Sequence, residues 1–269
     1  MHQIEAALSA FELVEHGKAR AYLRREDAAW LQAAGVLAPA TLVGPGALDR
    51  GRGARVALGG RQCFVKHYVR GGLLGRAFGD RYVSAARFGR DLAAGEVVRR
   101  SGVPAPAVLA LVIETEGLLC RAWQISEFVE GLVELGSALA VRAGRARREI
   151  LRGAGRAVRR MHDAGVAHPD LTLRNVAVDG AGTVMLLDFD RCTLAPWAAR
   201  RRHNLFRLHR SARKAGVWRG GDAARAERRD IAAFLCGYRR KGDAARVAAC
   251  AFAFYRAWER VHALFWTRS

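Results

Sequence analysis

Two short polar segments carry the residue types that a phosphoryl-transfer reaction needs. The first is residues 168–175, HPDLTLRN, and the second is the tripeptide DFD, which directly follows an apolar run. A carboxylate can orient an acceptor hydroxyl and take its proton, so we assign Asp170 as the catalytic base. Oxygen ligands suit the Mg²⁺ that accompanies a nucleoside triphosphate, so we expect Asn175 and Asp188 to bind this metal, with Asp190 as an auxiliary contact to the metal or to the acceptor.

The order and spacing of these residues match the pattern H-x-D-L-x-x-x-N followed by D-F-x of protein kinases. Pro169 replaces the arginine that in many protein kinases couples this loop to a phosphorylated activation segment. The sequence also lacks an A-P-E motif at a useful distance, because Ala195-Pro196-Trp197 follows the DFD tripeptide too closely. Peptide substrates need that segment, so we expect a small-molecule or glycan acceptor. We interpret His168 as a structural residue that braces the loop.

The N-terminal half should supply a phosphate-covering loop and a lysine. We assign the backbone of Gly51 and Gly53 to the phosphate cover, and Lys66, on the third expected strand, to phosphate binding and catalysis. This lysine needs a carboxylate from the following helix, and Asp91 and Glu96 both qualify. Five positions on a helix turn through about 140°, so only one of them can face the strand.

The run ISEFVEG at residues 125–131 is typical of a connection between two lobes. We expect the backbone of Glu127 and Val129 to bind the edge of the adenine base there.

The residue pattern predicts an α+β class with a two-lobed, protein-kinase-like fold. A β-rich N-lobe, residues 1–130, would cover the nucleotide with a sheet and one helix. A helical C-lobe, residues 131–269, would hold the catalytic loop, the metal site and the acceptor-binding helices. We expect strands at 19–23, 54–58, 61–68, 108–113 and 118–128, a hairpin turn at Gly59-Gly60, helices at 87–100 and 145–164, two short strands within 166–190, and helices from 197 to 266.

The chain is strongly basic. Its 269 residues include 45 Lys and Arg against 25 Asp and Glu, a formal net charge of +20. Such a charge implies a polyanionic partner, which could be nucleic acid, an acidic membrane surface or a phosphorylated ligand. Few aromatic residues lie among the basic ones and no nucleic-acid-binding motif is found, so we expect no nucleic acid. The alternative, a basic nucleic-acid-binding protein, predicts binding that does not depend on Asp170.

Cysteine usage and hydropathy indicate a cellular compartment. The five cysteines are scattered and never form a CxxC pair, which favours neither disulfides nor a zinc site but a reducing environment. The N-terminus lacks the basic segment and apolar core of a signal peptide. The longest charge-free apolar run, residues 103–113, is too short to cross a bilayer. We therefore expect a cytoplasmic protein that can still bind a membrane surface.

With these residues in place, the chain resembles the lipopolysaccharide-core sugar kinases, and among them the 3-deoxy-D-manno-octulosonic acid (Kdo) kinases. The resemblance extends from about residue 51 to residue 214. Its most specific parts are KHYVRGGL at 66–73, DRYV at 80–83, VPAP at 103–106, DFDR at 188–191 and NLFRLHRSARK at 204–214.

The resemblance implies ATP and Mg²⁺ as cofactors and transfer of the γ-phosphate to a hydroxyl of an inner-core sugar, foremost Kdo on a lipid A precursor. The acceptor would be a lipid-linked core oligosaccharide at the cytoplasmic face of the inner membrane, whose anionic surface would bind the protein peripherally. The resemblance also assigns the partner of Lys66 to Asp91, which leaves Glu96 as a solvated residue. Another hydroxyl acceptor, such as heptose or an aminoglycoside, is the alternative.

The basic residues that follow the DFD tripeptide acquire a role through this resemblance. We expect their charges to meet lipid A phosphates, the Kdo carboxylate or anionic lipid headgroups, although a solvated helix face is the alternative interpretation. They are Arg200, Arg201, Arg202, Arg207, Arg210, Arg213, Lys214 and Arg219.

Overall fold

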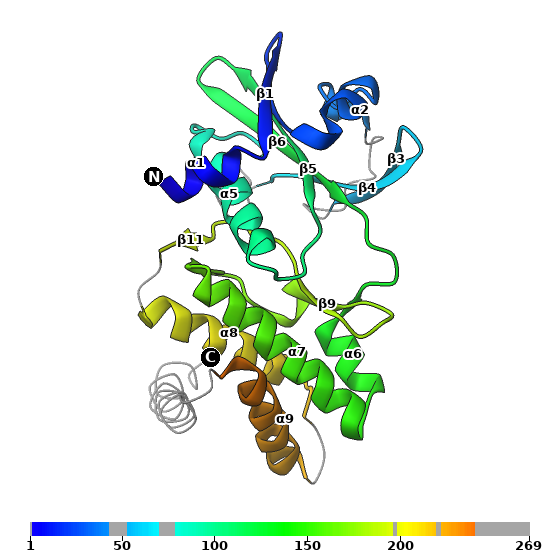
Figure 1. Cartoon of the computed structure of the whole chain (residues 1–269), viewed down its shortest axis with the longest axis vertical. Helices are drawn as coiled ribbons and strands as arrows, with labels where there is room; N and C mark the ends of the chain where they lie inside the picture. Colours follow the sequence, from blue (N-terminus) through cyan, green and yellow to red (C-terminus); the bar gives the residue numbers. More distant parts are fainter. Residues whose placement is uncertain (1, 43–52, 70–78, 196–197, 219–221, 240–269) are drawn as a thin grey trace. The chain divides into compact units, whose positions relative to one another are not determined.

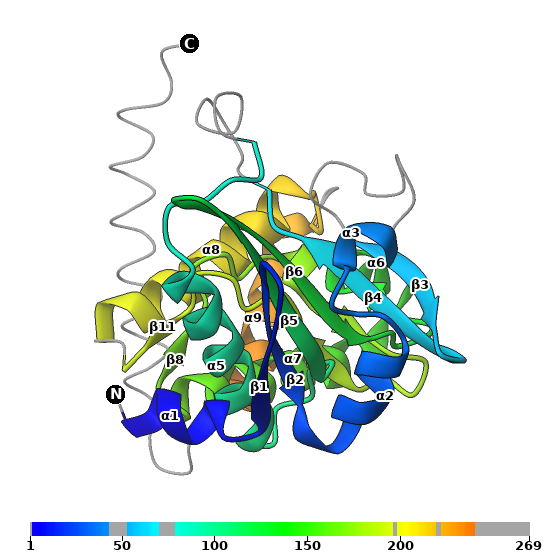
Figure 2. The same ribbon diagram turned by 90° about the horizontal axis from the view of Figure 1, so that it is seen from above.

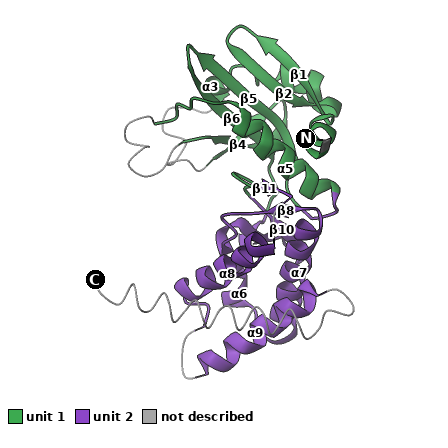
Figure 3. Ribbon diagram, turned by 90° about the vertical axis from the view of Figure 1, so that its left-hand side faces the viewer, with its two compact units in different colours: residues 1–100, 105–130, 188–192 green, residues 101–104, 131–187, 193–269 purple. Residues whose placement is uncertain are grey.

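The structure is a computed structural model that describes residues 2–42, 53–69, 79–195, 198–218 and 222–239. The chain forms two compact units (Figure 3). Unit 1 comprises residues 1–100, 105–130 and 188–192, and unit 2 comprises residues 101–104, 131–187 and 193–269. The DFD tripeptide therefore belongs to unit 1, whereas the HPDLTLRN segment belongs to unit 2.

An antiparallel sheet of six strands forms the body of unit 1, in the order β1-β2-β5-β6-β4-β3 (Figure 1). Its strands are β1 (Phe11–His16), β2 (Ala19–Arg24), β3 (Ala54–Leu58), β4 (Arg61–His67), β5 (Val108–Glu116) and β6 (Leu119–Glu127). The unit also contains helices α1 (His2–Leu8), α2 (Ala28–Ala33), α3 (Pro39–Leu42) and α5 (Ala86–Arg100), and a 3₁₀ turn at Arg25–Asp27. The five strands and the helix expected in this part of the chain are confirmed, with ends that differ by a few residues.

The β3–β4 hairpin positions Lys66, and its turn chemistry explains why it forms. Gly59 and Gly60 both have positive φ angles, 47° and 80°, which a two-residue hairpin turn requires and glycine adopts without steric cost. This turn sets Leu58 opposite Arg61 and Ala54 opposite Val65. On its other side β4 pairs with β6, where Lys66 lies opposite Gln124.

In unit 1 the sequence prediction missed β1 and the short helices α1, α2 and α3. Strand β1 is an edge strand with charged residues, and its Leu13 is 51% exposed, so it lacks the apolar pattern of a core strand. Because β1 precedes the expected strands, Lys66 lies on the fourth strand in chain order and not on the third.

The sheet of unit 1 is buried on both faces. Because successive side chains of a strand point to opposite faces, neighbouring residues of one strand enter two different cores. On β5, Val112 joins the core that contains Leu31 of α2. Its neighbour Leu111 joins the core around Phe88 of α5. Figure 2 shows α2 and α5 on opposite sides of the strands. Helix α5, which carries both candidate acidic partners of Lys66, is therefore held by a packed core.

Unit 2 is mainly helical. Its helices are α6 (Leu135–Val141), α7 (Gly144–Asp163), α8 (Ala198–Lys214) and α9 (Ala223–Tyr238), and a 3₁₀ turn spans Leu173–Asn175. Strands β7 (Val133–Glu134), β9 (Val176–Val178) and β10 (Val184–Leu186) form one small sheet, and β8 (Val166–Ala167) pairs with β11 (Thr193–Leu194). Helix α7 confirms the helix expected at 145–164. Helices α8 and α9 lie in the expected helical region, whose last part is outside the described residues.

Helices α7 and α9 pack so closely that their crossing requires glycine. A Cβ atom on Gly155 would lie 2.1 Å from the carbonyl oxygen of Phe234, and one on Gly237 would lie 2.0 Å from that of Arg152. No side chain fits at such distances, so the backbones of the two helices touch directly.

The described residues thus combine an antiparallel sheet with helices, which agrees with the predicted mixed α and β class. No helix in the described parts of the chain has the length and apolar character needed to cross a membrane.

Candidate functional site

Lys66 and the DFD tripeptide form a cluster of one cation and two carboxylates within unit 1. The Nζ atom of Lys66 lies 2.6 Å from Oδ1 of Asp188 and 2.7 Å from Oδ2 of Asp190. Burial acts to lower the pKa of Lys66, but the charges of Asp190 and Asp188 outweigh it and the pKa is raised. Lys66 therefore keeps its positive charge in this environment.

The backbone at Asp188 lets both carboxylates reach the same amine. We expected Asp188 and Asp190 to share an orientation if the preceding strand continued, but β10 ends at Leu186. Asp188 instead has a φ of 58°, in the left-handed region that residues other than glycine seldom adopt. Phe189 packs toward α5, where a Cβ on Gly95 would lie 3.5 Å from its ring. The two aspartates converge through a local turn and not through strand alternation.

Asp91 of α5 lies beside this cluster without pairing directly with Lys66. Its Oδ1 accepts a hydrogen bond from the backbone N–H of Arg191 at 2.8 Å, and its Oδ2 lies 3.9 Å from Nη2 of Arg87. The predicted Lys66–Asp91 ion pair is not found among the described residues, because the two DFD aspartates take the Lys66 ammonium. Burial and the charge of Asp190 raise the pKa of Asp91 to about 7.

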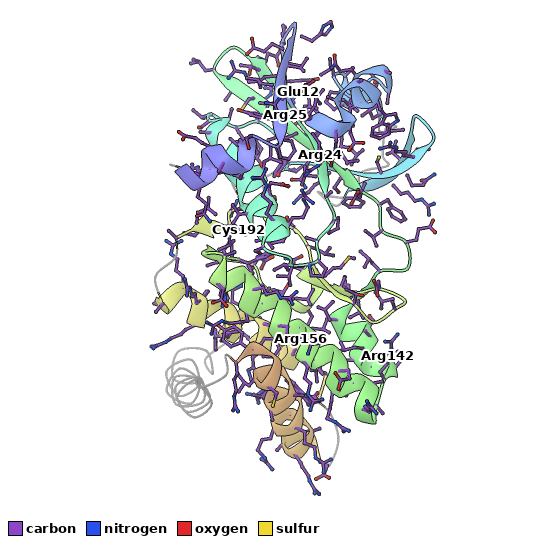
Figure 4. The ribbon with its side chains drawn as sticks, viewed as in Figure 1. Glu12, Arg24, Arg25, Arg142, Arg156 and Cys192 are labelled. Carbon is purple, nitrogen blue, oxygen red and sulfur yellow. The ribbon has the colours of Figure 1, made fainter. Side chains whose placement is uncertain are left out.

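Glu96, on the same helix, is the centre of a buried ion-pair group, so the prediction that it is solvated was wrong. It is 2% exposed and lies 2.9 Å from Nη2 of Arg24, which is itself 3% exposed (Figure 4). Arg99 and Arg100 also bind it, at 2.9 Å and 3.0 Å. Burial would raise the pKa of Glu96, but hydrogen bonds from Arg99, Arg24 and Arg100 lower it to about 2. Arginines three and four positions after Glu96 were the available signal.

The two glycines assigned to the phosphate cover have different outcomes. Gly51 lies outside the described residues. Gly53 has a packing role, because a Cβ there would lie 2.4 Å from the carbonyl oxygen of Val65. Phosphate binding by either glycine stays a prediction.

The expected adenine contacts lie at the end of β6. The backbone N–H of Glu127 donates to the carbonyl of Ala107 at 2.9 Å, and its Oε2 accepts from the Ala107 N–H at 3.0 Å. The N–H of Glu127 is therefore already engaged. Val129 follows two residues later and is half-buried. Binding of adenine by Glu127 and Val129 stays a prediction.

In unit 2 the HPDLTLRN segment folds into a loop that His168 braces. This side chain is fully buried, with 0% exposure. Its Nδ1 accepts from the backbone N–H of Asp170 at 3.2 Å, and its Nε2 faces the carbonyl of Leu187 at 3.0 Å. One ring nitrogen accepts and the other donates, which is the neutral form of histidine. The predicted structural role of His168 is confirmed.

The loop brings Asp170 and Asn175 together, as its spacing predicted. Nδ2 of Asn175 donates to the backbone carbonyl of Asp170 at 2.8 Å and lies 3.4 Å from its Oδ2. The other carboxylate oxygen, Oδ1, accepts from Nη2 of Arg207. The Asp170 side chain is nevertheless 61% exposed. An accessible carboxylate with a fixed orientation has the geometry of a general base.

Helix α8 contributes contacts that the sequence analysis did not connect to this loop. Oδ1 of Asn204 accepts from the backbone N–H of His168 at 2.9 Å, and its Nδ2 donates to the His168 carbonyl at 2.8 Å. Oγ of Ser211 accepts from the backbone N–H of Leu173 at 3.0 Å. Asn204, Arg207 and Ser211 are three and four positions apart, so they share one helix face. That spacing, within NLFRLHRSARK, was the available signal.

A buried histidine on α7 supports Asn204. The acceptor atom Oδ1 of Asn204 lies 3.1 Å from Nε2 of His162, which must donate, and Nδ1 of His162 accepts from the Tyr238 hydroxyl at 2.8 Å. Burial lowers the pKa of His162 to about 4, so the ring is neutral. Hydrogen bonds therefore connect α9, α7 and α8 to the loop that carries Asp170.

The other basic residues that follow the DFD tripeptide have varied surroundings. Nη1 of Arg200 donates to Oγ1 of Thr193 at 2.5 Å, and Nε of Arg213 lies 3.9 Å from Glu227. Arg202 is exposed, and Arg219 lies outside the described residues. Anion binding by this segment stays a prediction.

A metal site is not preformed in the described parts of the chain, where no group of three or more His, Cys, Asp or Glu side chains is arranged to hold an ion. The donor types nevertheless fit Mg²⁺, since Asp188 and Asp190 offer hard carboxylate oxygens that converge on one cation, the Lys66 ammonium. Metal binding by Asn175, Asp188 and Asp190 stays a prediction.

Comparison with known proteins agrees with these features. A family model described as the lipopolysaccharide kinase (Kdo/WaaP) family matches residues 46–238. A protein from Vibrio cholerae named 3-deoxy-D-manno-octulosonic acid kinase is 34% identical over 195 residues, which cover 71% of this chain and 79% of that protein. Proteins of the same name from Vibrio vulnificus and Xanthomonas oryzae are 31% identical over 178 residues and 37% identical over 164 residues. These alignments cover 65% and 59% of this chain, and 73% and 64% of the two relatives.

The matched region contains Lys66, the HPDLTLRN loop, the DFD tripeptide and the α8 residues that bind the loop. The chain therefore belongs to the lipopolysaccharide kinase (Kdo/WaaP) family of phosphotransferases.

Proposed function

We propose that this protein is an ATP-dependent kinase that phosphorylates a hydroxyl of a lipopolysaccharide inner-core sugar, with Kdo on a lipid A precursor as the acceptor. Family membership and the names of the relatives support this substrate class. The observation that carries the proposal is the Asp170 carboxylate, which is 61% exposed although Asn175 and Arg207 fix its orientation.

In this proposal Asp170 accepts the proton of the sugar hydroxyl while the hydroxyl oxygen attacks the γ-phosphorus. The bond from the γ-phosphorus to the bridging oxygen breaks, ADP leaves, and the proton later passes from Asp170 to solvent. Lys66 binds phosphate oxygens, because its ammonium keeps its charge. Asn175, Asp188 and Asp190 would hold Mg²⁺, which when bound offsets the negative charge of the triphosphate.

We assign nucleotide binding to the N-lobe, residues 1–130, and acceptor binding with catalysis to the C-lobe, residues 131–269, as in a two-lobed protein-kinase-like fold. The β-rich unit 1 and the helical unit 2 support this assignment. The backbone of Gly51 and Gly53 would cover the phosphates, and the backbone of Glu127 and Val129 would bind the adenine. Asp91 would assist on the nucleotide side, since it adjoins the cluster of Lys66.

The acceptor is lipid-linked, so we also propose peripheral contact with the anionic cytoplasmic face of the inner membrane. The net charge of +20 supports this, because each basic residue near an anionic surface contributes about 1 kcal/mol. Arg142 and the exposed Arg156 are two of the arginines in unit 2 (Figure 4). We expect the protein to sediment with anionic vesicles but not with zwitterionic ones, and to be released by salt.

The decisive experiment is transfer of radiolabel from [γ-³²P]ATP to a lipid A precursor that bears Kdo. Heptose-bearing and aminoglycoside acceptors are assayed in parallel, and label in one of these alone rejects the Kdo acceptor while keeping the reaction. Asp170→Asn should lower kcat by about 10²- to 10⁴-fold and leave nucleotide binding intact. Asp188→Asn should abolish turnover and also weaken nucleotide–metal binding. Glu12→Gln, on β1 (Figure 4), is the charge-matched control and should keep wild-type activity.

A further inference from the structure

The ion pair between Arg207 and Asp170 contributes little to the stability of the fold. Both side chains are accessible, at 38% and 61% exposure, and exposed ion pairs contribute little to folding. The backbone of the loop is already held at His168 by Asn204 and at Leu173 by Ser211. Arg207 is the member of this helix face that contacts the reactive side chain instead of the backbone.

The guanidinium of Arg207 has more donors than Asp170 can use. An arginine carries five N–H groups in a planar fork, and the contact to Asp170 engages Nη2. The Nε of Arg207 is buried and has no hydrogen-bond acceptor among the described residues. Nε is therefore closed to a bound molecule, but the side chain as a whole is 38% exposed, so its Nη atoms can donate to one.

We propose that Arg207 serves the phosphotransfer directly, by orienting Asp170 and by binding an anionic oxygen group next to the attacked hydroxyl. This inference rests on the proposed function, in which Asp170 is the base. Arg207 engages Oδ1, whereas Oδ2 accepts only a long hydrogen bond, 3.4 Å, from Nδ2 of Asn175, so we assign Oδ2 as the oxygen that accepts the proton of the acceptor hydroxyl. The γ-phosphorus must bond to that same hydroxyl, so its oxygens come within the neighbourhood of Asp170 and of the arginine bound to it.

Planar guanidinium groups bind phosphate and carboxylate oxygens in the same fork geometry. The anionic group has two sources in this reaction. It is either the phosphoryl group in transit, whose charge arginine stabilises in other phosphotransferases, or the carboxylate of the sugar acid. In either case Arg207 acts next to Asp170. Of the three partners expected for its basic segment, the inference retains the Kdo carboxylate, and it replaces the lipid A phosphates and the lipid headgroups by the transferred phosphoryl group.

The test compares Arg207→Gln and Arg207→Lys with wild-type protein in the radiolabel assay. Arg228→Gln, an exposed arginine on α9, is the control for loss of one positive charge. We expect Arg207→Gln to lower kcat/KM by about 10²- to 10³-fold, as loss of one preorganised donor does in other enzymes. Arg207→Lys should recover part of this loss, because it keeps the charge but not the fork. Melting temperature and nucleotide binding should match wild type in all variants.

An acceptor whose sugar carboxylate is converted to an amide separates the two sources. If Arg207 binds the phosphoryl group, Arg207→Gln loses kcat on both acceptors by the same factor. If it binds the acceptor carboxylate, Arg207→Gln raises KM for the acid, and wild type is impaired on the amide to the level of the variant.

Wild-type-like kcat/KM for Arg207→Gln, or an equal loss for Arg228→Gln, overturns the inference and leaves the proposed function standing. A wild-type protein that labels no sugar acceptor overturns the proposed function, and this inference with it.

Discussion

Helix α5 carries two buried carboxyl groups whose pKa values are shifted in opposite directions. Asp91 is 5% exposed and Glu96 is 2% exposed, yet the pKa of Asp91 is raised to about 7 and that of Glu96 is lowered to about 2. Burial disfavours the charged form of both, so partners decide the outcome. Glu96 has three guanidinium groups within 3.0 Å, whereas Asp91 has the guanidinium of Arg87 at 3.9 Å and a backbone N–H, that of Arg191, at 2.8 Å. Helix α5 therefore holds Glu96, which stabilises the fold as a charged group, and Asp91, beside the Lys66 cluster, which is readily protonated near neutral pH.

The largest expected effect comes from removing the Glu96 carboxylate. Glu96→Ala leaves the guanidinium of Arg24 buried without its partner, which should lower the free energy of unfolding by about 3–5 kcal/mol. Because the folded pKa of Glu96 lies below its unfolded value, wild-type stability from this group is present above pH 4.5 and is lost as the pH falls toward 2. Urea denaturation at several pH values measures both effects. A Glu96→Ala protein as stable as Glu12→Ala contradicts the comparison.

An intermediate effect of opposite sign is expected at Asp91. Its folded pKa lies above its unfolded value, so the stability of the protonated form is present below pH 3.8 and is lost as the pH rises through about 7. Asparagine resembles the neutral acid and can still accept from the Arg191 N–H. Asp91→Asn should therefore be more stable than wild type by about 1–3 kcal/mol at pH 8. The difference should shrink toward pH 4, and a pH-independent difference would falsify the assigned cause.

The smallest effect is expected at the rim of the Glu96 group. Arg100 is 44% exposed, and its Nε lies 3.0 Å from Glu96. Accessible ion pairs contribute little, so Arg100→Ala should cost about 0.2–1 kcal/mol in the same denaturation experiment. A loss as large as that of Glu96→Ala would mean that the buried Arg24 is not the main partner.

Local segments of the chain were predictable, and contacts between distant segments were not. The Gly59-Gly60 turn and the Asp170–Asn175 loop are specified by neighbouring residues, and both predictions are confirmed. The pairing of Arg24 with Glu96 joins residues 72 positions apart, and nothing near either residue indicates it. Periodicity also fails for an edge strand such as β1, whose exposed face carries no apolar pattern.

The catalytic-loop partners on α8 illustrate the same limit. The spacing of Asn204, Arg207 and Ser211 is visible in the sequence, but their targets lie 36 to 38 positions earlier. The basic character of the segment favoured an anion-binding interpretation, since charge is readable from composition whereas a hydrogen-bond partner is not. Lys66 was similarly predicted to bind phosphate and to pair with Asp91, whereas its direct partners in the structure are the DFD aspartates.

The glycine crossing of α7 and α9 has a consequence for the loop that neither helix carries. Gly237 sits beside Tyr238, whose hydroxyl begins the relay through His162 and Asn204 to His168. A single methyl group at the crossing would push α7 and α9 apart and lengthen the hydrogen bond between Tyr238 and His162. The distance between the backbones of α7 and α9 therefore affects the orientation of Asp170, although Asp170 lies on neither helix.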